Sequence, residues 1–171
     1  AGDKGVAVNA YLQSTSNPKI YAAGDAADTQ GAPLTPVAVF EGKVAASNML
    51  KGNRTKPDYA GVPSAVFTVP ELSRVGMLEE EAREAGHDIR VVENDTGDWY
   101  SNLRVGESCA ATKVIIDNEC DTILGAHLLG PEYGEIINFF GLAVRLGLTT
   151  SDLKKMVSAY PSVGSDLGSM V

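Results

Sequence analysis

Two short apolar runs in the second half of the chain constrain its fold more than any other feature. Residues 110–116 and 122–128 are each long enough for one strand, and only residues 117–121 separate them. That connection is short and polar, which is typical of a β-hairpin. The sequence therefore predicts an antiparallel sheet that contains this pair of strands.

Further strand and helix patterns surround the hairpin. Strands are expected at 64–68, 72–77 and 89–92, a loop at 94–97, and helices at 79–85, 135–146 and from the Thr149–Asp152 cap to about residue 157. Strands grouped in hairpins, with helices set to one side, predict an α+β domain. We expect this domain to occupy residues 63–171.

The first part of the chain has a different pattern. Short strands are expected at 6–9 and 19–25, and Thr35-Pro36 suits the start of a helix over 36–50, because threonine is a good N-cap and proline fits the first helical position. Gly52-Asn53 is a stop signal. We predict a fragment of an α/β domain at 1–52, followed by a polar, proline-containing linker at 53–62.

Gly24-Asp25 and Thr35-Pro36 together form a candidate ligand site. Glycine lets the backbone approach a ligand, and the carboxylate of Asp25 can bind a hydroxyl group. The helix that begins at Pro36 offers free N–H groups and a positive dipole end, which suit the anionic edge of a reduced flavin. From the residues alone, Gly-Asp after a strand is equally an ordinary turn.

The order of several motifs resembles the glutathione reductase family, which includes dihydrolipoamide dehydrogenase and mercuric reductase. Ile20-Tyr21-Ala22-Ala23-Gly24-Asp25 resembles its second flavin-binding motif, and Leu34-Thr35-Pro36-Val37-Ala38 resembles the segment that follows. The resemblance implies that Asp25 holds a ribityl hydroxyl of FAD, and that Thr35 and the helix start meet the flavin ring. Residues 63–72 and 123–130 resemble the opening and the final hairpin strand of the family's dimerisation domain.

The tail departs from the pattern of the disulfide-reducing members. They carry His-Pro-Thr-x-x-Glu, in which the histidine is the acid/base that acts in the partner subunit's active site. Here Tyr160 occupies the histidine position and Ser165 the glutamate position, with Asp166 next to it. Tyrosine titrates near 10, so it does not replace histidine as a base near neutral pH without a large shift. Tyr160 is thus either a candidate catalytic residue or a packing residue.

Cysteine and histidine give no metal-site signal. Cys109 and Cys120 form no C-x-x-C pair, and we expect two reduced, partly buried thiols. His127 lies in an apolar strand and is expected to be a satisfied sheet residue, whereas His87 follows a glycine in a turn and is expected to be solvated. Neither histidine has neighbours at ligand spacing, so no metal is predicted.

Charge limits the kinds of partner. The chain has 14 Lys and Arg against 22 Asp and Glu, a net charge of −8. Such a chain is a poor ligand for nucleic acid or anionic membranes, which need a positive field. No apolar run approaches the length of a membrane span, and the first residues do not resemble a signal peptide, so a cytoplasmic location is expected.

Three hypotheses follow. The first is the carboxyl-terminal portion of an FAD-dependent, NAD(P)H-using oxidoreductase that forms a homodimer. This portion is not active alone, because it lacks G-x-G-x-x-G and a redox cysteine pair; we expect it to lack bound FAD. The second is a stand-alone oligomerisation or binding module. The third is an independent thiol enzyme that uses Cys109 or Cys120.

Overall fold

The computed structural model describes residues 5–171. The chain divides into two compact units, one ending at Tyr59 and the other spanning Ala60–Val171, which we call unit 1 and unit 2. Within the described residues, no helix combines the length and the apolar character needed to cross a membrane.

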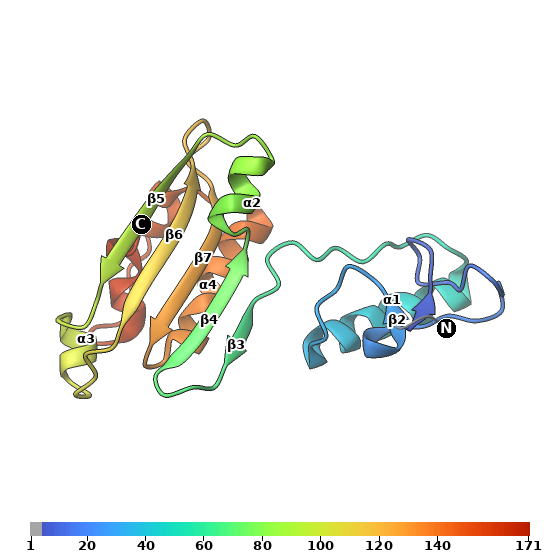
Figure 1. The fold of residues 1–171 in the computed structure, drawn as a ribbon, viewed down its shortest axis with the longest axis horizontal. Coiled ribbons are helices and arrows are strands. Elements are labelled where there is room, and N and C mark those ends of the chain that lie inside the picture. The colour runs from blue at the N-terminus through green and yellow to red at the C-terminus, as the bar shows by residue number, and fades with distance from the viewer. Residues whose placement is uncertain (1–4) are drawn as a thin grey trace. The chain divides into compact units, whose positions relative to one another are not determined.

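Unit 2 is built on a five-stranded antiparallel sheet (Figure 1). The order across the sheet is β3-β4-β7-β6-β5. The strands are β3 (Ser64–Val66), β4 (Glu71–Gly76), β5 (Ile89–Asp95), β6 (Ala111–Asp117) and β7 (Ile123–Gly130). The predicted hairpin is confirmed as β6 and β7, whose register runs from Ala111 opposite Leu129 to Ile116 opposite Ile123.

Helix α4 (Tyr133–Leu146) covers one face of this sheet. Its side chains Ile137 and Phe140 join Val75, Val114 and Leu128 of the sheet in the largest buried apolar cluster. The short helix α5 (Thr150–Lys154) and the 3-10 segment η2 (Val163–Ser169) extend the same cluster. The predicted α+β fold with an antiparallel sheet is confirmed.

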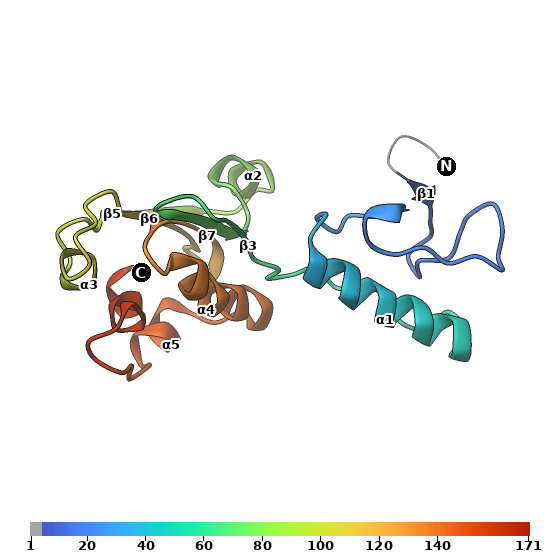
Figure 2. The same ribbon diagram turned by 90° about the horizontal axis from the view of Figure 1, so that it is seen from below.

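The short helix α2 (Glu79–Glu84) lies on the opposite side of the sheet from α4 and α5 (Figure 2). Its buried residue Ala82 forms a second, smaller apolar cluster of unit 2 with Ile89 and Ile115. Strands alternate their side chains between the two faces, and this is why Ile115 faces α2 while its neighbour Val114 faces α4. The helices are therefore concentrated on one face without being confined to it.

One helix of unit 2 was missed. Residues 94–97, expected as a loop, begin as the end of β5, and α3 (Tyr100–Leu103) follows them. The buried amide of Asn102 donates to the Thr96 carbonyl at 2.8 Å and to the Tyr133 hydroxyl at 3.2 Å. Tyr133 lies 31 residues further along the chain, and α3 has only four residues, so no apolar periodicity in the sequence indicates this turn of helix.

Unit 1 combines a two-stranded parallel sheet with one long helix. The strands β1 (Val6–Ala7) and β2 (Ala27–Asp28) pair in parallel. Helix α1 (Thr35–Lys51) confirms the predicted helix and ends at Gly52, which has a φ of 79°. Its buried face carries Val37, Glu41, Val44, Ala45 and Asn48.

The strand predicted over 19–25 is wrong. Only an isolated bridge between Tyr21 and Gln13 forms there, and the 3-10 segment η1 (Gly24–Ala26) replaces the end of the strand. Gly24 has a φ of 63°, in the left-handed region that glycine adopts easily, and this turns the chain away from an extended path.

Candidate functional site

The amino end of α1 is open. Its N-cap residue Leu34 has extended backbone, and no side chain caps the first turn. Pro36 occupies the first turn, where its missing N–H costs no hydrogen bond. Thr35 and Pro36 are exposed, so the remaining N–H groups and the positive dipole end are available to an electron-rich ligand edge.

The turn η1 lies against this helix. A Cβ atom on Gly24 would come within 2.7 Å of the Cβ of Ala38, so glycine is required for the close approach. Asp25, one residue further, is exposed. Gly24 and Asp25 line a hollow of about 350 Å³ together with Thr29, Pro33 and Glu41. The structure therefore gathers the sequence-predicted residues Gly24 and Asp25 beside the helix that Leu34, Thr35 and Pro36 begin.

Glu41 is a residue of this site that sequence reasoning missed. It is fully buried, and its carboxylate accepts hydrogen bonds from the Gly24 N–H at 2.6 Å, the Thr29 hydroxyl at 2.8 Å and the Tyr59 hydroxyl at 2.6 Å. Burial and the nearby Glu41 carboxylate raise the pKa of Tyr59 to about 12. The available signal was an acidic residue four positions after Val37, on the apolar face of α1.

Tyr160 lies in a second place, on unit 2. Its side chain is 76% exposed and stacks on Tyr100, with ring centroids 6.2 Å apart and an interplanar angle of 23°. The Ser165 hydroxyl donates to the Ser162 carbonyl at 2.5 Å, and Asp166 accepts from the Ser101 hydroxyl. Among the contacts of the described residues, the partner of the Tyr160 ring is thus an aromatic residue of α3, and neither Ser165 nor Asp166 binds its hydroxyl group.

The thiols are not buried. Cys109 and Cys120 are both exposed and free, which corrects the expectation of partial burial. Cys120 is exposed because it lies in the β6–β7 turn, and charged and polar groups rather than an apolar core hold that turn. Its sulfur is 2.9 Å from the Thr122 hydroxyl, and its backbone N–H donates to Asp117 at 3.3 Å.

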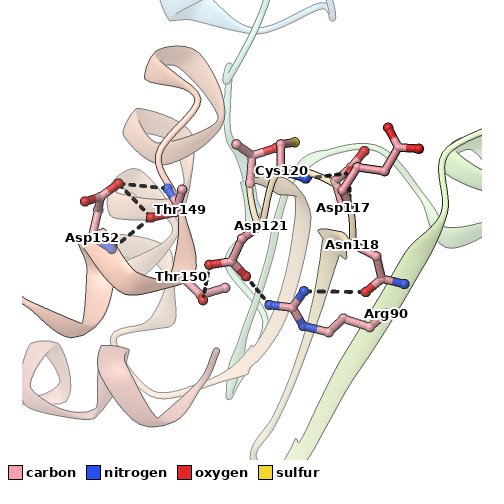
Figure 3. A network of polar contacts seen from close by, with 10 residues as sticks. Arg90, Asp117, Asn118, Cys120, Asp121, Thr149, Thr150 and Asp152 are labelled. Atoms are coloured by element: carbon pink, nitrogen blue, oxygen red, sulfur yellow. Dashed lines mark hydrogen bonds and ion pairs between the residues drawn. The ribbon is translucent and has the colours of Figure 1, made fainter.

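A polar network fixes the same turn (Figure 3). Asp121 accepts from Arg90 of β5 and from the Thr150 hydroxyl of α5 at 2.8 Å. Arg90 is the main reason that the pKa of Asp121 is below its usual value. At the start of α5, Thr149 and Asp152 form a reciprocal capping box. This arrangement explains Cys120 as part of a structural turn and gives no support to a thiol enzyme.

The histidines also have structural partners. His87 lies 2.8 Å from Asp117 through Nδ1 and is thus ion-paired or hydrogen-bonded rather than simply solvated. Its contact is the main reason that the pKa of Asp117 is lowered. His127 on β7 contacts the Met77 carbonyl at 3.2 Å. Within residues 5–171, no group of three or more His, Cys, Asp or Glu side chains is placed to hold a metal ion.

Comparison with known proteins identifies the larger unit. Residues 62–171 match the family described as pyridine nucleotide-disulphide oxidoreductase, dimerisation domain.

The chain belongs to this family.

Similarity to individual oxidoreductases extends through both units. The chain is 35% identical to the chloroplastic/mitochondrial glutathione reductase of Pisum sativum, over 99% of the chain and 30% of that enzyme. The HOCl-induced flavoprotein disulfide reductase RclA of Escherichia coli has the same fold, with a TM-score of 0.87 and 31% identity over 99% of the chain and 39% of RclA. The chain thus spans well under half the length of these reductases.

A relative of similar length also exists. The uncharacterized 19.7 kDa protein in the mercuric resistance operon of Staphylococcus aureus is 53% identical, over 98% of the chain and 93% of that protein. The chain is therefore similar to a protein of about its own length as well as to part of longer reductases.

The residues present fit one side of a flavin. Gly24 permits the close approach of the turn to α1, Asp25 offers an exposed carboxylate, and the uncapped helix start offers N–H groups. The sequence contains no G-x-G-x-x-G run for the pyrophosphate of a dinucleotide. The chemistry of these residues therefore suits the ribityl and ring side of a flavin rather than its ADP side.

Proposed function

We propose that the chain forms a two-fold symmetric homodimer through residues 63–171, and that residues 1–52 contribute the flavin-ring side of the FAD site in an NAD(P)H-dependent oxidoreductase. In that site the Asp25 carboxylate would accept a hydrogen bond from a ribityl hydroxyl. The start of α1, formed by Leu34, Thr35 and Pro36, would lie against the flavin ring. When bound, FAD would supply the electron transfer. Similarity to the flavoprotein disulfide reductase RclA supports the flavin, and membership of the pyridine nucleotide-disulphide oxidoreductase family supports the nicotinamide cofactor.

The observation that carries the dimer is the two-sided apolar character of α4. Ile137 and Phe140 face the core, whereas Phe139, Leu142 and Leu146 are 40%, 52% and 61% exposed on the other side. A helix that is apolar on both sides is usually covered on both sides. A symmetric copy of the same helix would cover the outer residues, as an isologous interface requires.

Sedimentation tests this interface. Leu142→Glu should convert the dimer to a monomer, because the charge would have to be buried against the partner. Leu50→Glu is the matched control: Leu50 is 85% exposed on α1, and this variant should remain dimeric. A wild-type chain that sediments as a monomer at micromolar concentration contradicts the proposal.

The flavin part has its own test. The chain alone should be colourless, because it supplies only the ring side of the site. A yellow preparation with stoichiometric flavin would show that the site is more complete than we propose.

Tyr160 would occupy the position of the family acid/base toward the partner's active site, and its exposure is compatible with that position.

A stand-alone oligomerisation module is the second candidate, and the length of the Staphylococcus aureus relative favours it. Both candidates predict the dimer. The reading frame upstream of Ala1 separates them, because only the first requires a preceding flavin-binding and nicotinamide-binding region. Either protein is expected in the cytoplasm, where exposed thiols such as Cys109 and Cys120 stay reduced.

A further inference from the structure

Glu41 is buried in unit 1 although it is ionisable. It is 0% exposed and lies on the face of α1 between Val37 and Val44. A buried carboxylate is unfavourable unless hydrogen bonds replace its water. The Gly24 N–H and the hydroxyl groups of Thr29 and Tyr59 meet this requirement.

The donors come from three separate segments. The Gly24 N–H belongs to η1, which carries Asp25; Thr29 follows β2; and Tyr59 is the last residue of unit 1. Oε2 accepts from Gly24, while Oε1 accepts from both hydroxyl groups. One side chain therefore joins the turn of the candidate flavin site to the end of the unit.

The surroundings leave little freedom. A Cβ atom on Gly31 would lie 2.7 Å from Oε1 of Glu41 and 2.8 Å from the Tyr59 ring. The Gly31 N–H donates to the Thr29 hydroxyl at 3.1 Å. The Tyr59 ring also makes an edge contact with Phe40, with centroids 6.5 Å apart. The cluster is thus held by packing as well as by hydrogen bonds.

We propose that Glu41 is a positioning residue: its carboxylate fixes the Gly24–Asp25 turn in the geometry that presents Asp25, and it couples that turn to Tyr59. The assignment of the turn to a flavin rests on the proposed function above. Glu41 borders the same hollow but has no exposed surface, and it acts through the Gly24 N–H. A side chain that only fills space would be replaced by glutamine without consequence for that N–H.

Glu41→Gln tests the positioning role in the full chain. Glutamine keeps the shape but removes the charge, so the Gly24 N–H either bonds to a neutral amide oxygen or, where the NH2 group faces it, loses its acceptor. The weakening or loss of a hydrogen bond to a charged group predicts that hydrogen exchange at the Gly24 amide rises by about tenfold. The Gly24 proton resonance, assigned by glycine labelling, should also move upfield, because a charged acceptor is replaced by a neutral one or lost.

Tyr59→Phe tests the coupling with a variant that retains the ring. Removing the hydroxyl should raise exchange at Gly24 severalfold, although Gly24 and Tyr59 do not bond each other. Tyr21→Phe is the matched control, because the Tyr21 hydroxyl donates to Asn53 at 2.7 Å in the same unit and does not touch Glu41. It should leave Gly24 unchanged.

Two results would overturn the proposal. One is a folded Glu41→Gln chain whose Gly24 exchange and resonance match the wild type. The other is equal exchange at Gly24 in Tyr59→Phe and Tyr21→Phe, which decides the matter even where Glu41→Gln fails to fold. Neither readout needs flavin or a dimer. A chain that sediments as a monomer, or that holds stoichiometric flavin, contradicts the proposed function, and the expected exchange at Gly24 in that same chain leaves the role of Glu41 intact.

Discussion

The two units are stabilised in different ways. Unit 2 has a continuous apolar cluster that runs from Val75 on the sheet through Phe140 of α4 to Met170 near the end of the chain. Among the described residues of unit 1, the buried apolar cluster consists of Leu12, Val44 and Ala45. Its long helix instead carries two buried polar side chains on the same face, Glu41 and Asn48.

This contrast separates stability from geometry. Apolar burial is non-directional and scales with area, so it stabilises unit 2 without requiring one fixed position for each atom. Hydrogen bonds add modest net stability but require directed partners. A unit held by buried polar groups is therefore suited to fixing the position of a turn, and unit 1 is where the candidate flavin residues lie.

The largest expected effect is in the apolar core of unit 2. Phe140→Ala should lower the free energy of unfolding by about 3–5 kcal/mol, because it removes a fully buried aromatic ring and leaves a cavity. The single tryptophan, Trp99, packs against this core and reports the transition by fluorescence in urea. A loss below about 1 kcal/mol would mean that the core does not dominate unit 2.

The next effect is in the polar framework of unit 1. Asn48 is 1% exposed, donates to the carbonyls of Tyr11 and Thr55 at 2.9 and 2.8 Å, and accepts from the N–H groups of Arg54 and Thr55. Asn48→Ala should destabilise unit 1 by about 2–3 kcal/mol, measured by exchange of α1 amides.

Asn53→Ala is the control for that substitution, because Asn53 is exposed and its loss should stay within about 0.5 kcal/mol. Equal losses of stability in Asn48→Ala and Asn53→Ala would contradict the view that buried polar side chains stabilise unit 1.

A smaller loss of stability is expected at the polar cap of helix α5 in unit 2. The Thr149 hydroxyl accepts from the Asp152 N–H at 3.1 Å and caps α5. Thr149→Ala should cost about 1 kcal/mol by urea unfolding. Ser151→Ala, at an exposed position of the same helix, should be nearly neutral. A cost near that of Phe140→Ala would weaken the distinction between the two kinds of stabilisation.

The smallest effect is a pH dependence confined to unit 2, which contains both histidines. Burial, assisted by Arg74 and Lys113, lowers the pKa of His127. Below about pH 6.5 the unfolded chain therefore binds more protons than the folded chain. The free energy of unfolding of unit 2 falls as the pH drops through that value, and it levels off below the pKa of His127 in the folded state. His127→Gln should flatten this part of the wild-type curve, measured by Trp99 fluorescence; a curve that keeps its full slope assigns the dependence to another group.

Local patterns in the sequence were sufficient for the main elements. The β6–β7 hairpin followed from two apolar runs and a short polar connection, and α1 followed from Thr35-Pro36 at its start and Gly52 at its end. These signals lie within a few residues of the structure that they predict, which is why they can be read without knowing the fold. The same patterns, with the family resemblance, indicated the α+β class and the dimerisation domain.

Tertiary structure alone decided how the candidate site is held. Glu41 meets Gly24 and Tyr59 across 17 and 18 residues, and Ser101 meets Asp166 across 65. Such pairs form only because the tertiary fold brings distant segments together, and a single sequence does not indicate which distant segments will meet. The buried carboxylate and the stacked Tyr100–Tyr160 pair follow from long-range contacts, because directed polar and aromatic partners are set by the packed fold.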